Sequence, residues 1–106
     1  MTFRKAASLA DLWSGEMRGV LVDGRRVLLV NLDGDVHAYE DRCLHQSVPL
    51  SEGRLEGHVL TCSAHEWQYD ACTGRGINPE NVRLRGFAVR LEGDDVLVDV
   101  TAEASA

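Results

Sequence analysis

The sequence is poor in positive charge and in proline, and it contains no long hydrophobic run. Its 106 residues carry 17 acidic and 11 basic side chains, a formal net charge of -6 at pH 7. No Lys/Arg cluster interrupts this acidic bias, so a phosphate backbone would be repelled and we expect no nucleic-acid partner. No stretch approaches the roughly 20 apolar residues that cross a bilayer, and the N-terminus lacks the apolar region of a signal peptide. We therefore expect a cytoplasmic protein without membrane contacts.

Cysteine is scarce as well. Three cysteines cannot all pair, and a cytosolic compartment keeps thiols reduced, so we expect no disulfide scaffold. With 44% hydrophobic residues, a chain of this length has apolar material for one core, which predicts a single domain over residues 1–106. A small acidic protein is suited to meeting basic patches on larger partners, and Glu52, Glu56 and Glu66 are candidates for such contacts.

Short apolar runs separated by Gly-containing turns make up most of the sequence. Asp-Gly and Gly-Asp dipeptides favour tight hairpins because these residues tolerate positive φ. The predicted hairpins join residues 20–22 to 27–30, 27–31 to 36–39, and 87–91 to 96–100. We expect one helical turn from Ser8 to Trp13, with Ser8 as N-cap, and a disordered tail over residues 101–106. The pattern predicts an all-β fold, either a sandwich or a barrel.

A segment of different character, residues 43–81, lies between these β regions. It holds all three cysteines, three of the four histidines and both prolines. Cys43 and His45 form a C-x-H motif, and Cys62 and His65 form a C-x-x-H motif that is separated from it by 16 residues. Each of two loop tips thus offers one thiolate and one imidazole, and we expect this segment to be an insertion that builds a metal site.

These four side chains suit a 2Fe-2S cluster. Such a cluster takes two terminal ligands on each iron, and in the Rieske variant two histidines replace two cysteines on one iron. Cys2His2 is also an ordinary ligand set for structural zinc. Zinc modules, however, usually pair cysteine with cysteine and histidine with histidine, whereas each half of this motif mixes the two types. The mixing favours the cluster, and a zinc-stabilised interaction module is the alternative.

The chain resembles the Rieske family, and more closely the small ferredoxin component of multicomponent di-iron monooxygenases that oxidise toluene, alkenes or isoprene. The similarity extends over nearly the whole length. It is carried by residues 13–17, 43–46, 50–53, 61–62, 64–65, 67, 73–74, 76–79 and 93–95. The two ligand motifs are specific to Rieske proteins, whereas Trp67 and the Gly-Ile-Asn-Pro sequence of residues 76–79 indicate the monooxygenase group.

The resemblance implies an antiparallel β-sandwich base with a cluster-binding subdomain inserted at about residues 43–81. It implies that Cys43, His45, Cys62 and His65 hold one Rieske-type 2Fe-2S cluster. The implied function is transfer of single electrons from an NADH-dependent flavin and iron–sulfur reductase to a di-iron hydroxylase. The chain would then be a monomeric carrier and not an enzyme by itself. The ferredoxin of an aromatic-ring dioxygenase and a nitrite-reductase-like small subunit share the motifs and remain alternatives.

Four residues near the predicted ligands are expected to lie beside the cluster or to contact partners: Gln46, Trp67, Gly76 and Pro79. We expect Trp67 to be a packing anchor, because a large ring beneath the ligand loops supports them. Residues 74–79 are expected to form a third loop that covers the cluster, since glycine allows close approach of the backbone.

The reduction potential is expected to be low. Respiratory Rieske proteins carry an extra disulfide, at positions that Val48 and Ala64 occupy here, and a serine hydroxyl near a cluster sulfide, at the position of Trp67. The loss of a hydrogen-bond donor to sulfur lowers the potential. We therefore expect a midpoint toward the negative end of the Rieske range of about -150 to +300 mV.

Three remaining residues with reactive side chains are predicted to have no part in the site. Cys72 has no neighbouring base in the sequence, so we expect an inert buried cysteine or a free thiol. His37 and His58 lie in strand-like stretches without cysteine neighbours, and we expect structural or solvent-facing roles for both.

Overall fold

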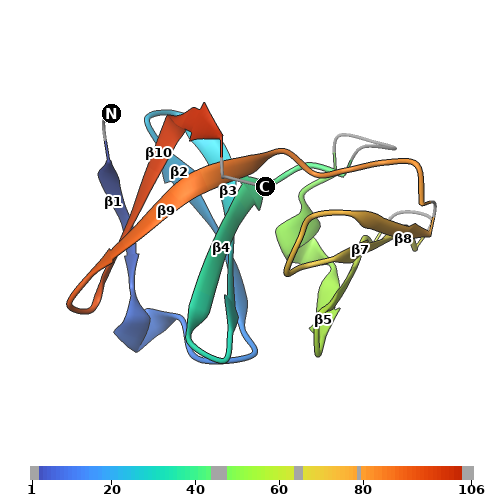
Figure 1. The fold of residues 1–106 in the computed structure, drawn as a ribbon, viewed down its shortest axis with the longest axis horizontal. Helices are drawn as coiled ribbons and strands as arrows, with labels where there is room; N and C mark the ends of the chain where they lie inside the picture. The colour runs from blue at the N-terminus through green and yellow to red at the C-terminus, as the bar shows by residue number, and fades with distance from the viewer. Residues whose placement is uncertain (1–2, 44–47, 64–65, 79, 104–106) are drawn as a thin grey trace.

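The computed structural model describes residues 3–43, 48–63, 66–78 and 80–103 (Figure 1). Within these residues the strands are β1 (Arg4–Ser8), β2 (Met17–Val22), β3 (Arg25–Leu32), β4 (Asp35–Glu40), β5 (Arg54–Glu56), β6 (Val59–Thr61), β7 (Gln68–Asp70), β8 (Gly76–Asn78), β9 (Gly86–Glu92) and β10 (Asp95–Glu103). Two short 3-10 helices are η1 (Leu9–Asp11) and η2 (Leu50–Glu52). No helix of this part of the chain is long and apolar enough to cross a membrane. The predicted all-β fold is confirmed.

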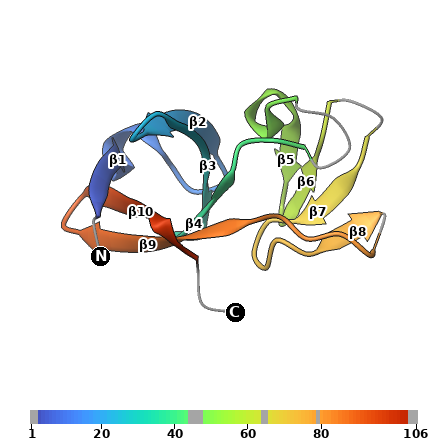
Figure 2. The same ribbon diagram turned by 90° about the horizontal axis from the view of Figure 1, so that it is seen from above.

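The six longer strands form an antiparallel sheet, here called the base, in the order β1-β10-β9-β4-β3-β2. The three predicted hairpins are confirmed as β2–β3, β3–β4 and β9–β10. In the first of them Asp23 and Gly24 both have positive φ, 50° and 79°, which is the conformation that such a turn requires. The base curls until its two edge strands, β1 and β2, contact each other (Figure 2).

The four short strands form a second antiparallel sheet in the order β5-β6-β7-β8. The chain enters this smaller sheet after β4 and leaves it before β9, and the two sheets lie side by side (Figures 1 and 2). Strands β4 and β9 are neighbours in the base, where Ala38 pairs with Phe87 and Tyr39 pairs with Gly86. The smaller sheet is therefore an insertion between two adjacent strands of the base.

Strand β3 connects two hydrophobic cores because both of its faces are buried. Successive side chains of a strand point to opposite faces. Leu28 and Val30 pack in the core shared with the smaller sheet, whereas Val27 and Leu29 pack in the core inside the base. All four side chains are fully buried, which explains why residues 27–30 form a continuous apolar run and not an alternating one.

Two predictions about the first and last segments need correction. The helical turn expected from Ser8 to Trp13 is only the 3-10 helix η1, although Ser8 caps it as predicted: its Oγ accepts a hydrogen bond from the Ala10 N–H at 3.3 Å. Strand β10 includes residues 101–103, so the predicted disordered tail is wrong for these three residues. Its partner β1 was not predicted, because the sequence RKAAS has no alternation of apolar and polar residues.

A buried carboxylate at the end of β4 fixes the first turn of the insertion to the base. Asp41 is 5% exposed and accepts two hydrogen bonds from Ser51 of η2, one from N–H at 2.8 Å and one from Oγ–H at 2.7 Å. Gly19 of β2 leaves room for this contact, because a Cβ at that position would lie 2.6 Å from the Ser51 Oγ. The end of β4, the 3-10 helix η2 and strand β2 therefore meet at the carboxylate of Asp41.

We expect Asp41→Ala to lower the free energy of unfolding by about 1–3 kcal/mol, because the N–H and hydroxyl of Ser51 lose their acceptor. Chemical denaturation measures the loss. The control is Asp35→Ala, the same truncation at an exposed position of β4, where a surface substitution should stay within about 0.5 kcal/mol. Equal losses in the two variants would show that this carboxylate does not hold the junction.

Candidate metal centre

Cys43 and Cys62 each donate a backbone hydrogen bond to a residue a few positions later in the chain. Cys43 follows β4, and its N–H donates to the Val48 carbonyl at 2.9 Å. Cys62 follows β6, and its N–H donates to the Trp67 carbonyl at 2.8 Å. Each hydrogen bond joins a cysteine to the residue five positions later in the chain. Both loops are thus closed at their base in the same way, with a cysteine at the point of closure.

Both cysteines belong to the core that the two sheets share, and each is only 1% exposed. An apolar setting of this kind controls solvent access to a metal group. By sequence, His45 belongs to the first loop and His65 to the second, and both lie outside the described residues. The described residues contain no group of three His, Cys, Asp or Glu side chains able to hold a metal ion.

Tyr69 of β7 places a hydroxyl beside one of the two sulfurs. Its oxygen lies 3.6 Å from the Cys43 Sγ, and the tyrosine is fully buried. A thiolate can only accept a hydrogen bond, so in a metal-bound state the Tyr69 O–H is the donor. Tyr69 was not predicted from the sequence. The one feature of the sequence that could have indicated Tyr69 is the order of residues 68–70, in which an aromatic residue lies between two polar residues.

Two of the four residues predicted to lie beside the cluster are described. Trp67 is half-buried and packs against the core that contains both cysteines. Gly76 is also half-buried, but it lies in β8, so the predicted covering loop is wrong for residues 76–78. Gln46 and Pro79 lie outside the described residues. A role for these four residues beside the cluster stays a prediction.

The structure corrects the surroundings of two other residues. Cys72 is exposed and forms no disulfide, so the expected burial is wrong and the free thiol is correct. His58 lies in the exposed turn between β5 and β6 and not in a strand. His37 does lie in a strand, β4, where its ring stacks on Tyr39 at a centroid distance of 6.4 Å. Its Nε2 is buried and has no hydrogen-bond partner among the described residues.

The three acidic residues predicted to meet partners, Glu52, Glu56 and Glu66, are all exposed. Two of them form ion pairs with the same arginine: the guanidinium of Arg54 lies 2.8 Å from the Glu56 carboxylate and 3.7 Å from the Glu66 carboxylate. Ion pairs at such exposed positions contribute little to stability and leave the carboxylates accessible to solvent. Their role in meeting a partner stays a prediction.

The family model of the Rieske [2Fe-2S] domain matches residues 2–88. The chain belongs to the Rieske family. This Rieske chain is 52% identical over 89 residues to the ferredoxin component of the alkene monooxygenase system of Xanthobacter autotrophicus, covering 83% of this chain and 73% of that relative. It is 39% identical over 106 residues to the biphenyl dioxygenase ferredoxin subunit of a Pseudomonas species, covering 98% and 97% of the two chains.

Solved structures agree with this family membership. The Rieske chain superposes on a chain of the complex of reduced oxygenase and oxidized ferredoxin in carbazole 1,9a-dioxygenase with a TM-score of 0.86 and 28% identity, covering 98% of this chain and 97% of that one. The ferredoxin of carbazole 1,9a-dioxygenase from Nocardioides aromaticivorans gives a TM-score of 0.84 and 27% identity, covering 92% and 97%.

Membership of the family confirms the predicted cofactor, one Rieske-type 2Fe-2S cluster. The two buried thiols fit this group, whose sulfur ligands are cysteine thiolates. The alternative of a zinc-stabilised interaction module is therefore wrong. Relatives of the Rieske chain are named as ferredoxin components of oxygenase systems. This confirms the prediction of an electron carrier that is not an enzyme by itself.

We expect Tyr69→Phe to lower the midpoint potential of the Rieske protein, because a hydrogen bond donated to a ligand sulfur favours the more negative, reduced state. A difference of about 1 kcal/mol between the two redox states corresponds to about 40 mV for a one-electron couple. Protein-film voltammetry measures the shift.

The matched control for this shift is Tyr39→Phe. The Tyr39 hydroxyl is also buried, but it donates to the Ala71 carbonyl at 2.7 Å and not to a sulfur. We expect Tyr39→Phe to leave the potential unchanged. Equal shifts in the two variants would contradict the assignment of Tyr69 as the donor to Cys43.

Proposed function

We propose that this chain transfers single electrons from an NADH-dependent flavin and iron–sulfur reductase to the di-iron hydroxylase of a monooxygenase that oxidises aromatic hydrocarbons or alkenes. The observation that supports this most is the 52% identity to the ferredoxin component of an alkene monooxygenase system. When bound, the cluster supplies a centre that accepts and releases one electron at a time. A carrier of this kind binds two partners in turn, which suits small interfaces that release quickly.

We propose that the cluster is held by Cys43 and Cys62 on one iron and by His45 and His65 on the other. The equivalent closures of the two loops support this assignment, because they present both thiols from the base of a loop into one core. The two thiolates lie in the protein interior. Imidazole ligands in place of two more thiolates leave the centre less negative, which makes it easier to reduce than an all-cysteine cluster.

The proposed domain organisation is a single Rieske domain over residues 1–106 with a cluster-binding subdomain at about residues 43–81. In support, the whole of the smaller sheet lies between Arg54 and Asn78. That sheet shares one core with the base, and β3, β4 and both cysteines contribute to it. A monomeric state and a cytoplasmic location stay predictions of the sequence.

The ferredoxin of an aromatic-ring dioxygenase is the second candidate. It is favoured by the 39% identity to the biphenyl dioxygenase ferredoxin subunit, which extends over 98% of this chain. The likeness to a putative nitrite reductase small subunit, at 22% identity, supports the fold alone.

Reconstitution separates the two main candidates. The purified protein is combined with NADH, a reductase and either a di-iron hydroxylase or a ring-hydroxylating oxygenase, and product formation is followed. We expect turnover with the di-iron hydroxylase that depends on this chain. Turnover with the ring-hydroxylating oxygenase alone would favour the second candidate, and turnover with neither would contradict both.

We expect Cys62→Ala to abolish cluster binding, because it removes one thiolate of the proposed ligand set. The visible absorbance, the iron content and the acid-labile sulfide of the purified protein measure the loss. Cys72→Ala is the matched control, since Cys72 is exposed and the same truncation there removes no proposed ligand. A Cys62→Ala protein with full iron and sulfide content would refute the ligand assignment.

We expect a midpoint potential below zero, toward the negative end of the Rieske range of about -150 to +300 mV. The physical reason is the tryptophan at position 67, which cannot supply the hydroxyl donor that raises the potential of respiratory Rieske proteins. Voltammetry of the wild-type protein measures it. A midpoint well above zero would contradict this expectation.

A further inference from the structure

The fold brings together arginines that are scattered along an acidic sequence. A groove of about 1220 Å³ runs along β4 and along residues 83–89. Its charged lining residues are Glu40, Arg42, Arg75, Arg83 and Arg85. Four arginines therefore face a single carboxylate. The sequence contains no Lys/Arg cluster, but the fold gathers these four arginines around one groove.

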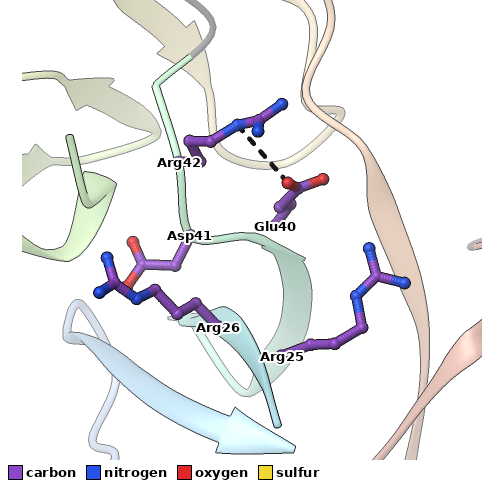
Figure 3. Close-up of a pocket in the computed structure, with 5 residues that line it drawn as sticks. All are labelled: Arg25, Arg26, Glu40, Asp41 and Arg42. Carbon is purple, nitrogen blue, oxygen red and sulfur yellow. Dashed lines mark ion pairs between the residues drawn. The ribbon is translucent and has the colours of Figure 1, made fainter. Parts of the chain in front are cut away.

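A second hollow, of about 280 Å³, adjoins this groove and shares Glu40 and Arg42 with it. It adds Arg25, Arg26 and Asp41, all gathered around the end of β4 (Figure 3). The Arg42 Nε lies 3.5 Å from the Glu40 carboxylate. The carboxylate of Asp41 already accepts two hydrogen bonds in the junction described above. Among the described lining residues of the two hollows, the arginines thus outnumber the carboxylates.

Two of the groove arginines are held opposite each other. Arg75 and Arg83 are partners in an isolated antiparallel bridge, which places their Cβ atoms about 4.5–5.5 Å apart. Like charges that face each other directly across a strand pair are destabilising. Neither arginine forms an ion pair with a described residue. Folding stability therefore does not account for this pair.

A third arginine, Arg85, lies on the same side of the chain as Arg83, because successive side chains alternate between buried and exposed. Leu84 is buried, whereas its neighbours Arg83 and Arg85 are both exposed and both line the groove. The guanidinium of Arg85 lies 5.8 Å from the centroid of the Phe87 ring, a cation–π distance that anchors it.

Two residues with ring side chains, Tyr39 and His37, also line the groove. Tyr39 lines it, and the hydroxyl of this residue donates to the Ala71 carbonyl at 2.7 Å. Burial raises the pKa of Tyr39, so its phenol stays neutral at physiological pH. The imidazole of His37 also lines the groove, stacked beside this ring. Glu40 is thus the one acidic side chain among the described residues that line the groove.

We propose that this groove binds an extended acidic segment of a protein that exchanges electrons with this chain. The inference rests on the proposed function. Charge complementarity supports it, because Asp and Glu side chains bind arginine through paired, charge-assisted hydrogen bonds. The volume favours a segment of a protein over a small anion, since it exceeds the roughly 300–1,000 Å³ of small-molecule sites. Arg42, which lines the groove, directly precedes the proposed ligand Cys43 in the sequence.

The test compares two double variants with the same net charge. Arg75→Glu with Arg83→Glu reverses the charge of two residues that line the groove. Like charges still face each other across the bridge, so we expect little change in folding stability. Arg4→Glu with Arg90→Glu is the control, because both arginines are exposed positions of the base outside the groove. Affinities for the reductase and for the hydroxylase are measured with cluster-loaded protein at low and high ionic strength.

We expect the groove variant to raise the dissociation constant for one of these partners about tenfold more than the control does at low salt. The difference should shrink at high salt, because added ions screen the interaction. Equal effects of the groove and control variants would overturn the proposal, since net charge alone would then explain them. Tight binding of inorganic pyrophosphate with unchanged partner affinity would also overturn it and identify a small-anion site.

A neutral variant adds a readout that a purely structural role would not produce. Arg75→Gln with Arg83→Gln removes the repulsion of like charges, so we expect a more stable protein that nevertheless binds its partner more weakly. A variant that is more stable and binds as well as wild type would contradict the proposal.

The two proposals fail in different ways. Wild-type protein that holds its cluster but supports no NADH-driven turnover contradicts the proposed function, and the groove assignment fails with it. Wild-type protein that supports turnover, together with a groove variant that behaves like its control, contradicts the groove assignment alone.

Discussion

Two backbone hydrogen bonds, from Cys43 to Val48 and from Cys62 to Trp67, set the geometry on which the rest of the molecule depends. Each closes a loop at a cysteine, and each loop follows a strand of a different sheet. Both thiols consequently enter one apolar core. The fold can be understood as the means of holding these two loop bases in fixed positions relative to each other.

The proposed metal centre is held rigidly because the base and the smaller sheet are joined by shared packing and by hydrogen bonds. β3 buries one face in each core, and Asp41 joins the end of β4 to the first turn of the insertion. A displacement of the insertion would therefore disturb buried side chains of the base as well. An electron carrier benefits from this arrangement, because a centre that is held in one preorganised geometry changes little when it gains or loses an electron. The charged surface is organised separately, with exposed carboxylates on the insertion and arginines in the groove beside β4.

Much of the base was predictable from the sequence, because its hairpins combine apolar runs with Asp-Gly or Gly-Asp turns. The strands of the insertion were not, since three-residue strands such as β5 and β8 are too short to show a period. Cysteine and histidine spacing indicated the cofactor, but Tyr69 became visible only when the fold placed it beside Cys43. The basic groove could not be predicted for the same reason, because Arg42 and Arg83 are far apart in the sequence and line one groove only in the folded chain.

The central claim is that the two loops hold one cluster through two sulfurs and two imidazole nitrogens. The most direct measurement is pulsed electron paramagnetic resonance of the dithionite-reduced protein, with histidine labelled by nitrogen-15 in a parallel sample. The account predicts strong couplings to histidine nitrogens that change with the label. A reduced cluster whose spectrum shows no coupling to histidine nitrogen would contradict it.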